Sequence, residues 1–304
     1  MKKTVKRIDG LLLLDKPLNQ SSNAVLQTVK RLFQAKKAGH TGSLDPLATG
    51  MLPICFGEAT KFSQFMLDAD KGYTATGKLG EITATQDSEG EVLEVNSVEH
   101  ITKAMLLEAL KKFTGPLEQV PSMYSALKKN GVPLYKLARQ GITVERKARS
   151  ITVYELTLEA FELPYFTVNV RCSKGTYIRN LVEDIGNYLG VGAFVSKLHR
   201  NFSCPFEDKP MILLEALKSG EVSETLLHPI RSMVSHLPVR NISRRQQELL
   251  YYGKSIEVKD KIEPNQLYQL INESGQFIGL GQYEETDRLK SKRLVQKQEV
   301  IESE

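Results

Sequence analysis

Residues 39–50, Gly-His-Thr-Gly-Ser-Leu-Asp-Pro-Leu-Ala-Thr-Gly, are the most informative stretch of this 304-residue chain. Three glycines and a proline surround one acidic residue, Asp45, and the apolar positions follow neither a helical nor a strand period. Asp-Pro is common in ordinary surface turns. Glycine also permits positive φ and close backbone approach, so such a loop can hold a carboxylate against a ligand. Composition alone favours the ordinary turn. We call these twelve residues the Asp45 loop.

The overall composition indicates a protein with a real core and no membrane segment. A chain of 304 residues has room for one large or two unequal domains, and 41% hydrophobic with 25% charged residues is typical of a soluble protein. The basic start is followed by an apolar run of only residues 11–14, too short for a signal sequence or a membrane span. Three cysteines without a CxxC spacing predict neither a disulfide framework nor a thiolate zinc site. We expect a cytoplasmic protein without a metal.

The distribution of charge is more informative than the net charge of +5. Residues 126–149 contain seven basic residues and one acidic residue, an excess larger than that of the whole chain. A second basic cluster, at residues 30–37, directly precedes the Asp45 loop. Charge runs are usually solvated faces. Two basic clusters, one of them beside a glycine-rich loop, fit binding of a polyanionic partner better than they fit solvated faces. Tyr124 and Tyr135 could stack on unpaired bases.

Apolar periodicity predicts helices and strands that do not repeat as βαβ units. Helices are expected from residue 21 to near residue 39 and over 58–67, 102–113 and 178–189; strands are expected over 10–14, 51–56, 73–79, 151–158 and 166–172. This pattern favours an α+β domain built on a mixed or antiparallel sheet.

The pattern changes near residues 228–238, where two prolines interrupt it. Short strands are expected beyond this break, over 255–258, 267–271 and 276–281, and predict a small β-rich C-terminal domain. Eleven basic and eleven acidic residues follow from residue 236 onward, so this domain is not strongly cationic. We expect residues 296–304 to fray.

Several long motifs resemble the TruB family of tRNA pseudouridine synthases, from about residue 8 to residue 295. The similar segments are the opening strand at 10–17, the Asp45 loop with its extension to residue 61, Lys71-Gly-Tyr73, the segment 121–141, and the strand–turn–helix at 172–179. The resemblance implies a pseudouridine synthase fold, with a central mixed or antiparallel sheet flanked by helices. It places the catalytic domain at 1–235, with a basic thumb insertion at about 122–149 (the thumb), and a PUA-like RNA-binding domain at 236–304.

The resemblance also implies the reaction, an isomerisation of uridine to pseudouridine at tRNA position 55 in the TΨC loop, without a cofactor. Asp45 would be the nucleophile on a uridine flipped out of its stack, attacking either the sugar or the base. A lone buried carboxylate tends toward its neutral form, and Arg179 is the cation implied to oppose this. Tyr73 would stack on the uracil and remove the sugar 2′ proton.

By the same resemblance, seven further residues bind substrate. They are His40 beside the displaced bases, Tyr177 and Leu198 in the uracil pocket, Lys16 and Arg200 near backbone or neighbouring groups, and Lys128 and Arg139 in the thumb.

One position departs from the family pattern, since Asn19 stands where the family usually has glycine. Asparagine tolerates left-handed backbone, so we expect the same turn.

The implied partners are the T-arm and acceptor end of tRNA, with no guide RNA, no membrane and a monomeric state. Two alternatives remain: a guide-RNA-dependent enzyme acting on ribosomal RNA, and a tRNA-binding or tRNA-folding protein. Leu47-Ala48 and the long insertion favour the stand-alone enzyme over the first.

Overall fold

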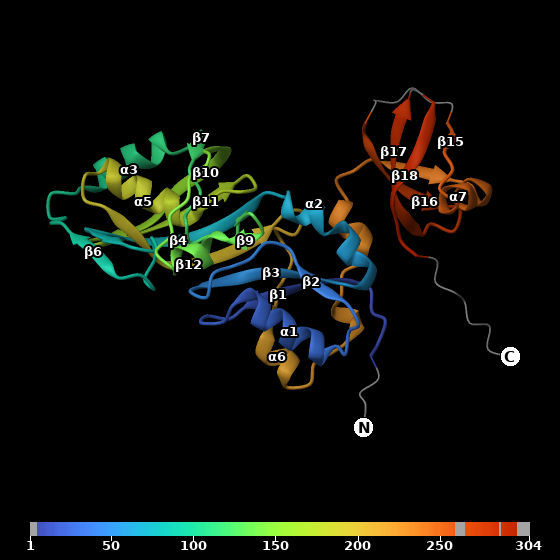
Figure 1. Ribbon diagram of the computed structural model, residues 1–304, viewed down its shortest axis with the longest axis horizontal. Coiled ribbons are helices and arrows are strands. Elements are labelled where there is room, and N and C mark those ends of the chain that lie inside the picture. The colour runs from blue at the N-terminus through green and yellow to red at the C-terminus, as the bar shows by residue number, and fades with distance from the viewer. Residues whose placement is uncertain (1–4, 259–264, 286, 297–304) are drawn as a thin grey trace.

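The computed structural model describes residues 5–258, 265–285 and 287–296, which form two large sheets and two small two-stranded sheets in one α+β chain (Figure 1). The larger sheet has nine strands in the order β13-β1-β3-β12-β4-β11-β10-β7, with β2 paired to β3. Its strands are β1 (Gly10–Lys16), β2 (Ala38–His40), β3 (Ala48–Phe56), β4 (Lys71–Leu79), β7 (Gly115–Gln119), β10 (Arg149–Glu162), β11 (Tyr165–Cys172), β12 (Ala193–Ser203) and β13 (Ile212–Leu213). Most pairs are antiparallel, while β1 with β13 and β12 with β3 are parallel, so the expected mixed sheet is confirmed.

Helices cover both halves of this sheet. They are α1 (Ser22–Leu32), η1 (Gly57–Phe62), α2 (Ser63–Leu67), α3 (Lys103–Lys112), α5 (Ile178–Tyr188), α6 (Leu214–Lys218), η2 (Glu224–Leu226) and η3 (Ile230–Val234). The helices α3 and α5 pack on the half that contains β4, β10 and β11, while α1 and α6 pack on β1 and β3. In the described part of the chain, no helix combines the length and apolar character that a membrane span requires.

The structure differs from the sequence expectations at two of these elements. The helix α1 ends at Leu32 rather than near residue 39, because Gln34 turns the chain with a φ of 52° and residues 38–40 join the sheet as β2. The central strand β12 was not expected. It lies between β3 and β4, and its two register shifts, together with polar residues among the apolar ones, obscure the strand period.

The C-terminal domain is a five-stranded sheet with one helix, as expected for a small β-rich unit. Its elements are β14 (Val239–Ile242), α7 (Arg244–Tyr251), β15 (Ile256–Glu257), β16 (Leu267–Asn272), β17 (Phe277–Glu285) and β18 (Arg288–Leu294). The helix α7 was not expected, although Ser243 and Gln246 form a capping box that marks its start. The predicted fraying of residues 296–304 lies outside the described residues, except at Gln296, which is hydrogen-bonded to Glu58 and Arg7.

The two sheets are joined through η1, which directly follows β3. The rings of Phe62 and Phe277 lie 5.6 Å apart, and Lys61 donates to the Leu294 carbonyl at 3.1 Å. The Glu58 carboxylate accepts the backbone N–H of Gln296 at 2.6 Å. Apolar and polar contacts therefore both fix the C-terminal domain to the end of a central strand.

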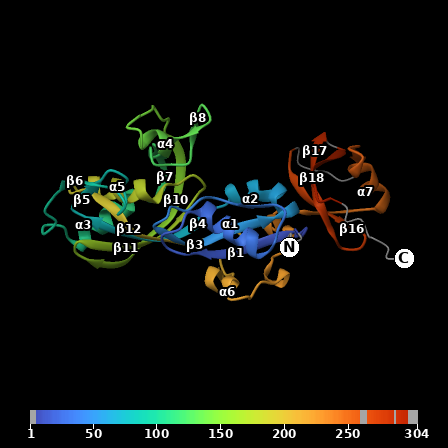
Figure 2. The ribbon, with the colours of Figure 1, turned by 60° about the horizontal axis from the view of Figure 1, so that its bottom comes forward.

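The thumb projects from the edge of the large sheet, between the paired strands β7 and β10 (Figure 2). It contains the two-stranded ladder β8 (Lys128–Lys129) with β9 (Val132–Pro133) and the short helix α4 (Leu134–Ala138). A second small ladder, β5 (Glu81–Thr83) with β6 (Val92–Val95), extends from β4, and residues 84–91 connect its two strands.

Gly186 allows close packing between α5 and the start of β12, since a Cβ there would lie 2.3 Å from the backbone nitrogen of Ala193. Gly186→Ala should therefore lower the free energy of unfolding by about 1–3 kcal/mol, through overpacking. Helix propensity alone would favour alanine by about 1 kcal/mol. Denaturant unfolding measures the difference, with Asn187→Ala, an exposed change in the same helix, as the control. An increase in stability for Gly186→Ala would contradict this packing argument.

Candidate active site

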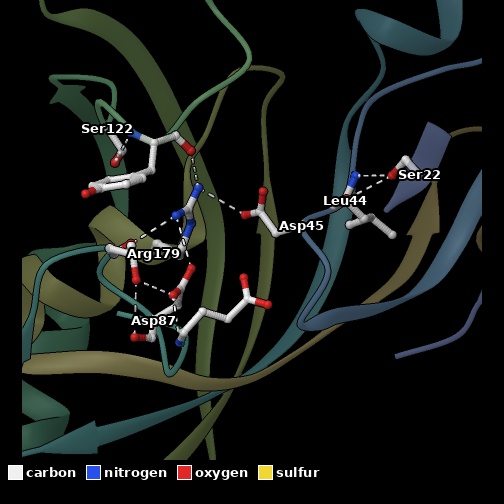
Figure 3. Close-up of polar contacts among 9 residues, drawn as sticks. Ser22, Leu44, Asp45, Asp87, Ser122 and Arg179 are labelled. Carbon is white, nitrogen blue, oxygen red and sulfur yellow. Dashed lines mark hydrogen bonds and ion pairs between the residues drawn. The ribbon is translucent and has the colours of Figure 1, made fainter. Parts of the chain in front are cut away.

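Asp45 lies between β2 and β3, and its carboxylate faces the guanidinium of Arg179 (Figure 3). Asp45 Oδ2 is 3.0 Å from Arg179 Nη2. The Asp45 side chain is 41% exposed, whereas that of Arg179 is only 6% exposed. The carboxylate is thus open to a ligand on one side and paired with a buried cation on the other.

The guanidinium of Arg179 is held by three further acceptors. Nη1 donates to the Asp87 carboxylate at 3.1 Å and to the Thr85 carbonyl at 2.9 Å. Nη2 donates to the Tyr124 carbonyl at 2.8 Å. A buried charge is costly unless it is paired and hydrogen-bonded, and these contacts meet that requirement.

Asp87 is a site residue that sequence reasoning missed. Its side chain is 3% exposed, and it accepts hydrogen bonds from the Thr85 hydroxyl and from the Glu89 backbone N–H. The surrounding polar residues 85–90 are typical of a surface turn, so no local pattern marks Asp87 as buried.

The pKa of Asp45 reflects competing influences. Burial raises the pKa of the carboxyl group above its ordinary value, and the like charge of Asp87 acts in the same direction. Arg179 and, to a smaller extent, Lys16 lower it. The net direction is upward, so Arg179 opposes the effect of burial without cancelling it.

Lys16 is fully buried at the end of β1, and its ammonium group binds backbone carbonyls. Nζ donates to Gln20 at 2.6 Å, to Pro17 at 2.8 Å and to Pro46 at 3.4 Å. Burial lowers the pKa of Lys16 to about 8. The structure therefore shows Lys16 tying β1 to the residue after Asp45.

Arg200 is 1% exposed on β12 and holds the other side of the Asp45 loop. Nε donates to the Met51 carbonyl at 2.6 Å, and Nη2 donates to the Gly42 carbonyl at 3.1 Å. Gly50 permits the close approach of β3 and β12, because a Cβ there would lie 2.3 Å from the Arg200 carbonyl oxygen. Like Lys16, Arg200 donates hydrogen bonds to backbone carbonyls of the protein.

Tyr73 and Leu198 lie under the Asp45 loop on the neighbouring strands β4 and β12. They are 8% and 9% exposed and share one apolar cluster with Leu44 and Leu47. Burial raises the pKa of the Tyr73 phenol, so this group is neutral near pH 7. The structure thus brings both residues into the layer beneath the Asp45 backbone.

His40 lies at the end of β2, and Tyr177 lies at the start of α5. Within the described residues, His40 Nδ1 is buried and has no hydrogen-bond partner. Burial lowers the pKa of this imidazole. Tyr177 is the N-cap residue of α5, and its backbone N–H and C=O both bond to the side chain of Gln119, at 2.9 and 3.1 Å. Gln119, 4% exposed, was also missed by sequence reasoning.

The thumb is anchored beside Arg179 and exposes its basic residues beyond that point. Asn180, next to Arg179, donates to the Val120 carbonyl at 3.1 Å. Lys128 and Arg139 are exposed, and the Arg139 guanidinium lies 5.7 Å from the ring centre of Tyr135. These two residues are thus on the projecting segment. The expected turn is present, since Asn19 has a φ of 61°.

Comparisons with known families match most of the chain. The "TruB family pseudouridylate synthase (N terminal domain)" model matches residues 30–178. The "tRNA pseudouridylate synthase B C-terminal domain" model matches residues 179–235, and the "Pseudouridine synthase II TruB, C-terminal" model matches residues 238–295.

Three similar relatives are each named tRNA pseudouridine synthase B. The protein from Legionella pneumophila (strain Lens) is 50% identical over 95% of this chain and 96% of the relative. The protein from Mannheimia succiniciproducens is 47% identical over 97% and 98%, and the protein from Haemophilus influenzae (strain 86-028NP) is 48% identical over 92% and 93%.

Solved structures share the fold. A chain of a Cbf5-Nop10-Gar1 complex has 26% identity and a TM-score of 0.71, covering 94% of this chain and 84% of that chain. A chain of an H/ACA RNP bound to a substrate RNA containing 2′-deoxyuridine has 24% identity and a TM-score of 0.71, covering 95% and 86%, and shows likeness of fold alone. With family models and relatives agreeing over nearly its whole length, this chain belongs to the TruB family of pseudouridylate synthases.

Proposed function

We propose that this protein is a tRNA pseudouridine synthase that converts the uridine at position 55, in the TΨC loop, to pseudouridine. The relatives of 47–50% identity support this substrate class, since they are named tRNA pseudouridine synthase B. The observation that carries the mechanism is the half-exposed Asp45 carboxylate, 3.0 Å from the buried Arg179 guanidinium. The reaction breaks an N–C glycosidic bond and rejoins the same uracil through carbon, so it consumes neither an oxidant nor water.

Asp45 is the proposed nucleophile. Attack at the anomeric carbon would displace uracil and form an ester with the ribose, whereas attack at the base would form an adduct with the ring. Either route begins from the ionised carboxylate, which Arg179 favours and orients. Because the uridine is stacked in the TΨC loop, it has to be flipped out to reach Asp45.

The other side chains of the site receive roles that their positions support. Tyr73 and Leu198, beneath the Asp45 loop, would contact the uracil, and Tyr177 would line the same pocket. The raised pKa of the Tyr73 phenol opposes its expected role as base for the 2′ proton, so we assign it the stacking role.

His40, with a buried unpartnered Nδ1 in the described structure, would hold the displaced bases. Lys16 and Arg200 support the loop from within.

We further propose that the thumb grips the T-arm and that the C-terminal domain contacts the acceptor end. The domain boundary is placed at residues 235–236, and the protein would act as a cytoplasmic monomer without guide RNA. The solved structures of similar fold are titled as a Cbf5-Nop10-Gar1 complex and an H/ACA RNP. The stand-alone function is favoured instead by the relatives of much higher identity over nearly the full length.

Asp45→Asn should reduce pseudouridine formation by more than about 10³-fold, because the amide cannot act as a nucleophile. The measurement is pseudouridine content in a T-arm stem-loop transcript incubated without guide RNA. Binding of the transcript should stay within about two-fold of the parent protein, since uncharged amide and carboxylate have the same shape. Asp208→Asn, which changes an exposed carboxylate, is the matched control. Full turnover by Asp45→Asn would exclude the proposed nucleophile, and an inactive parent protein would exclude the proposed function.

The single-turnover rate should fall as the pH is lowered through the raised pKa of Asp45, because protonation removes the nucleophile. Arg179→Gln removes the charge that lowers this pKa. Its acidic limb should therefore move to higher pH by about 1 unit or more. Arg179→Lys keeps a positive charge and should move the limb less. Identical acidic limbs in all three proteins would show that the ion pair does not control ionisation of Asp45.

Replacing Lys128 and Arg139 together by alanine should weaken T-arm binding at low salt. It should also reduce the slope of log affinity against log salt by about 0.7–0.9 for each lost phosphate contact. Affinity measured from low to moderate salt gives both quantities. Lys218→Ala is the control, because this lysine lies on α6, away from the thumb. A parent protein whose affinity does not change with salt would contradict the role given to the thumb.

A further inference from the structure

We propose that Ser22 is a positioning residue for Asp45: its hydroxyl clamps the backbone of Leu44, the residue immediately before the nucleophile. This inference rests on the proposed function, because it assigns Ser22 a part in the reaction at Asp45. It concerns a side chain outside the ion pair, on the first residue of α1.

The clamp consists of two hydrogen bonds made by one buried hydroxyl (Figure 3). Ser22 Oγ accepts the Leu44 backbone N–H at 2.8 Å and donates to the Leu44 carbonyl at 2.9 Å. Ser22 is 4% exposed, and Leu44 is 6% exposed. Water therefore cannot readily replace either bond if the hydroxyl is removed.

The Ser22 hydroxyl has no part in starting its own helix. The N-cap of α1 is Ser21, whose side chain accepts the Ala24 backbone N–H at 3.2 Å. A serine in the first turn commonly bonds to nearby backbone or to solvent. Ser22 instead bonds to a residue twenty-two positions away in sequence. Its placement is explained by the loop it holds rather than by helix capping.

The other neighbour of Asp45 is held by the same segment of chain. The Pro46 carbonyl accepts the Asn19 backbone N–H at 2.9 Å and the Lys16 ammonium at 3.4 Å. Residues 41–47 form no strand or helix, so these contacts replace regular pairing on both sides of Asp45. Residues 16–22 thus fix the backbone from which the carboxylate reaches Arg179.

Removing the hydroxyl of Ser22 leaves a buried N–H and a buried C=O without a partner. The loop can then regain pairing by moving, which shifts the Asp45 carboxylate from its place against Arg179. A displacement of about 1 Å in a reacting group can cost about 10²-fold in rate. The charged groups around Asp45 are Arg179, Asp87, Lys16 and Glu89, so its ionisation reports on this displacement.

The test compares the full-length parent protein with Ser22→Ala, Ser22→Thr and Ser203→Ala under single-turnover conditions at saturating T-arm. Ser203 is the matched control. It is fully buried, and within the described residues its hydroxyl has no hydrogen-bond partner. Ser22→Ala should lower the rate by about 10–100-fold, with RNA affinity within about two-fold of the parent protein. The acidic limb of its pH–rate profile should move to higher pH, because the Asp45 carboxylate loses its contact with Arg179. Ser22→Thr, which keeps a hydroxyl, should recover part of the rate, and Ser203→Ala should match the parent.

A thermal melt of each variant ensures that the rates are compared between folded proteins. If Ser22→Ala does not fold, Ser22→Cys provides a weaker donor and acceptor of similar size and should show a smaller loss with the same shift of the pH limb. A folded Ser22→Ala protein with the parent rate and the parent pH limb would overturn the inference while leaving the proposed function intact. An inactive parent protein would instead overturn the proposed function.

Discussion

The buried guanidinium of Arg179 is the group around which the site is assembled. A cation that is only 6% exposed needs acceptors on nearly every side, and here they come from three separate parts of the chain. They are the Asp45 loop, the β5–β6 connection with Thr85 and Asp87, and the base of the thumb at Tyr124, while α5 carries the arginine itself. Pairing one side chain therefore fixes the relative positions of all four.

The same burial has opposite effects on the charged groups of the site. It raises the pKa of Asp45 and lowers that of Lys16, so each charge depends on the partners that the fold provides. Arg179 favours the anionic carboxylate directly. Lys16 and Arg200 use their hydrogen bonds on backbone carbonyls around the Asp45 loop. Lys16 and Arg200 thus support the geometry of the Asp45 loop, whereas the exposed basic residues in the thumb remain available to a polyanion.

The agreement between sequence and structure follows the strength of the local signals. The strands around residues 10–14, 73–79 and 166–172 have clear apolar patterns, and the structure contains them. β12 and α7 were missed for different reasons. The register shifts of β12 obscure the alternation of its apolar and polar residues. The helix α7 is short and polar, and its capping box is its main sequence signal. Asp87 was missed because its importance comes from a long-range contact with Arg179 rather than from its neighbours.

The sequence by itself determined the fold class, the presence of a β-rich C-terminal domain and the family, because these depend on composition, periodicity and long motifs. The roles of Asp45 and Arg179 stay predictions that the motifs alone supplied. Only the tertiary structure decided which polar groups are buried and which hydrogen bonds they make. It placed Lys16 and Arg200 inside, paired Asp87 with the arginine, and set the Ser22 hydroxyl against Leu44. The physical reason is that burial and hydrogen bonding depend on which distant segments pack together, and no local pattern of residues encodes that choice.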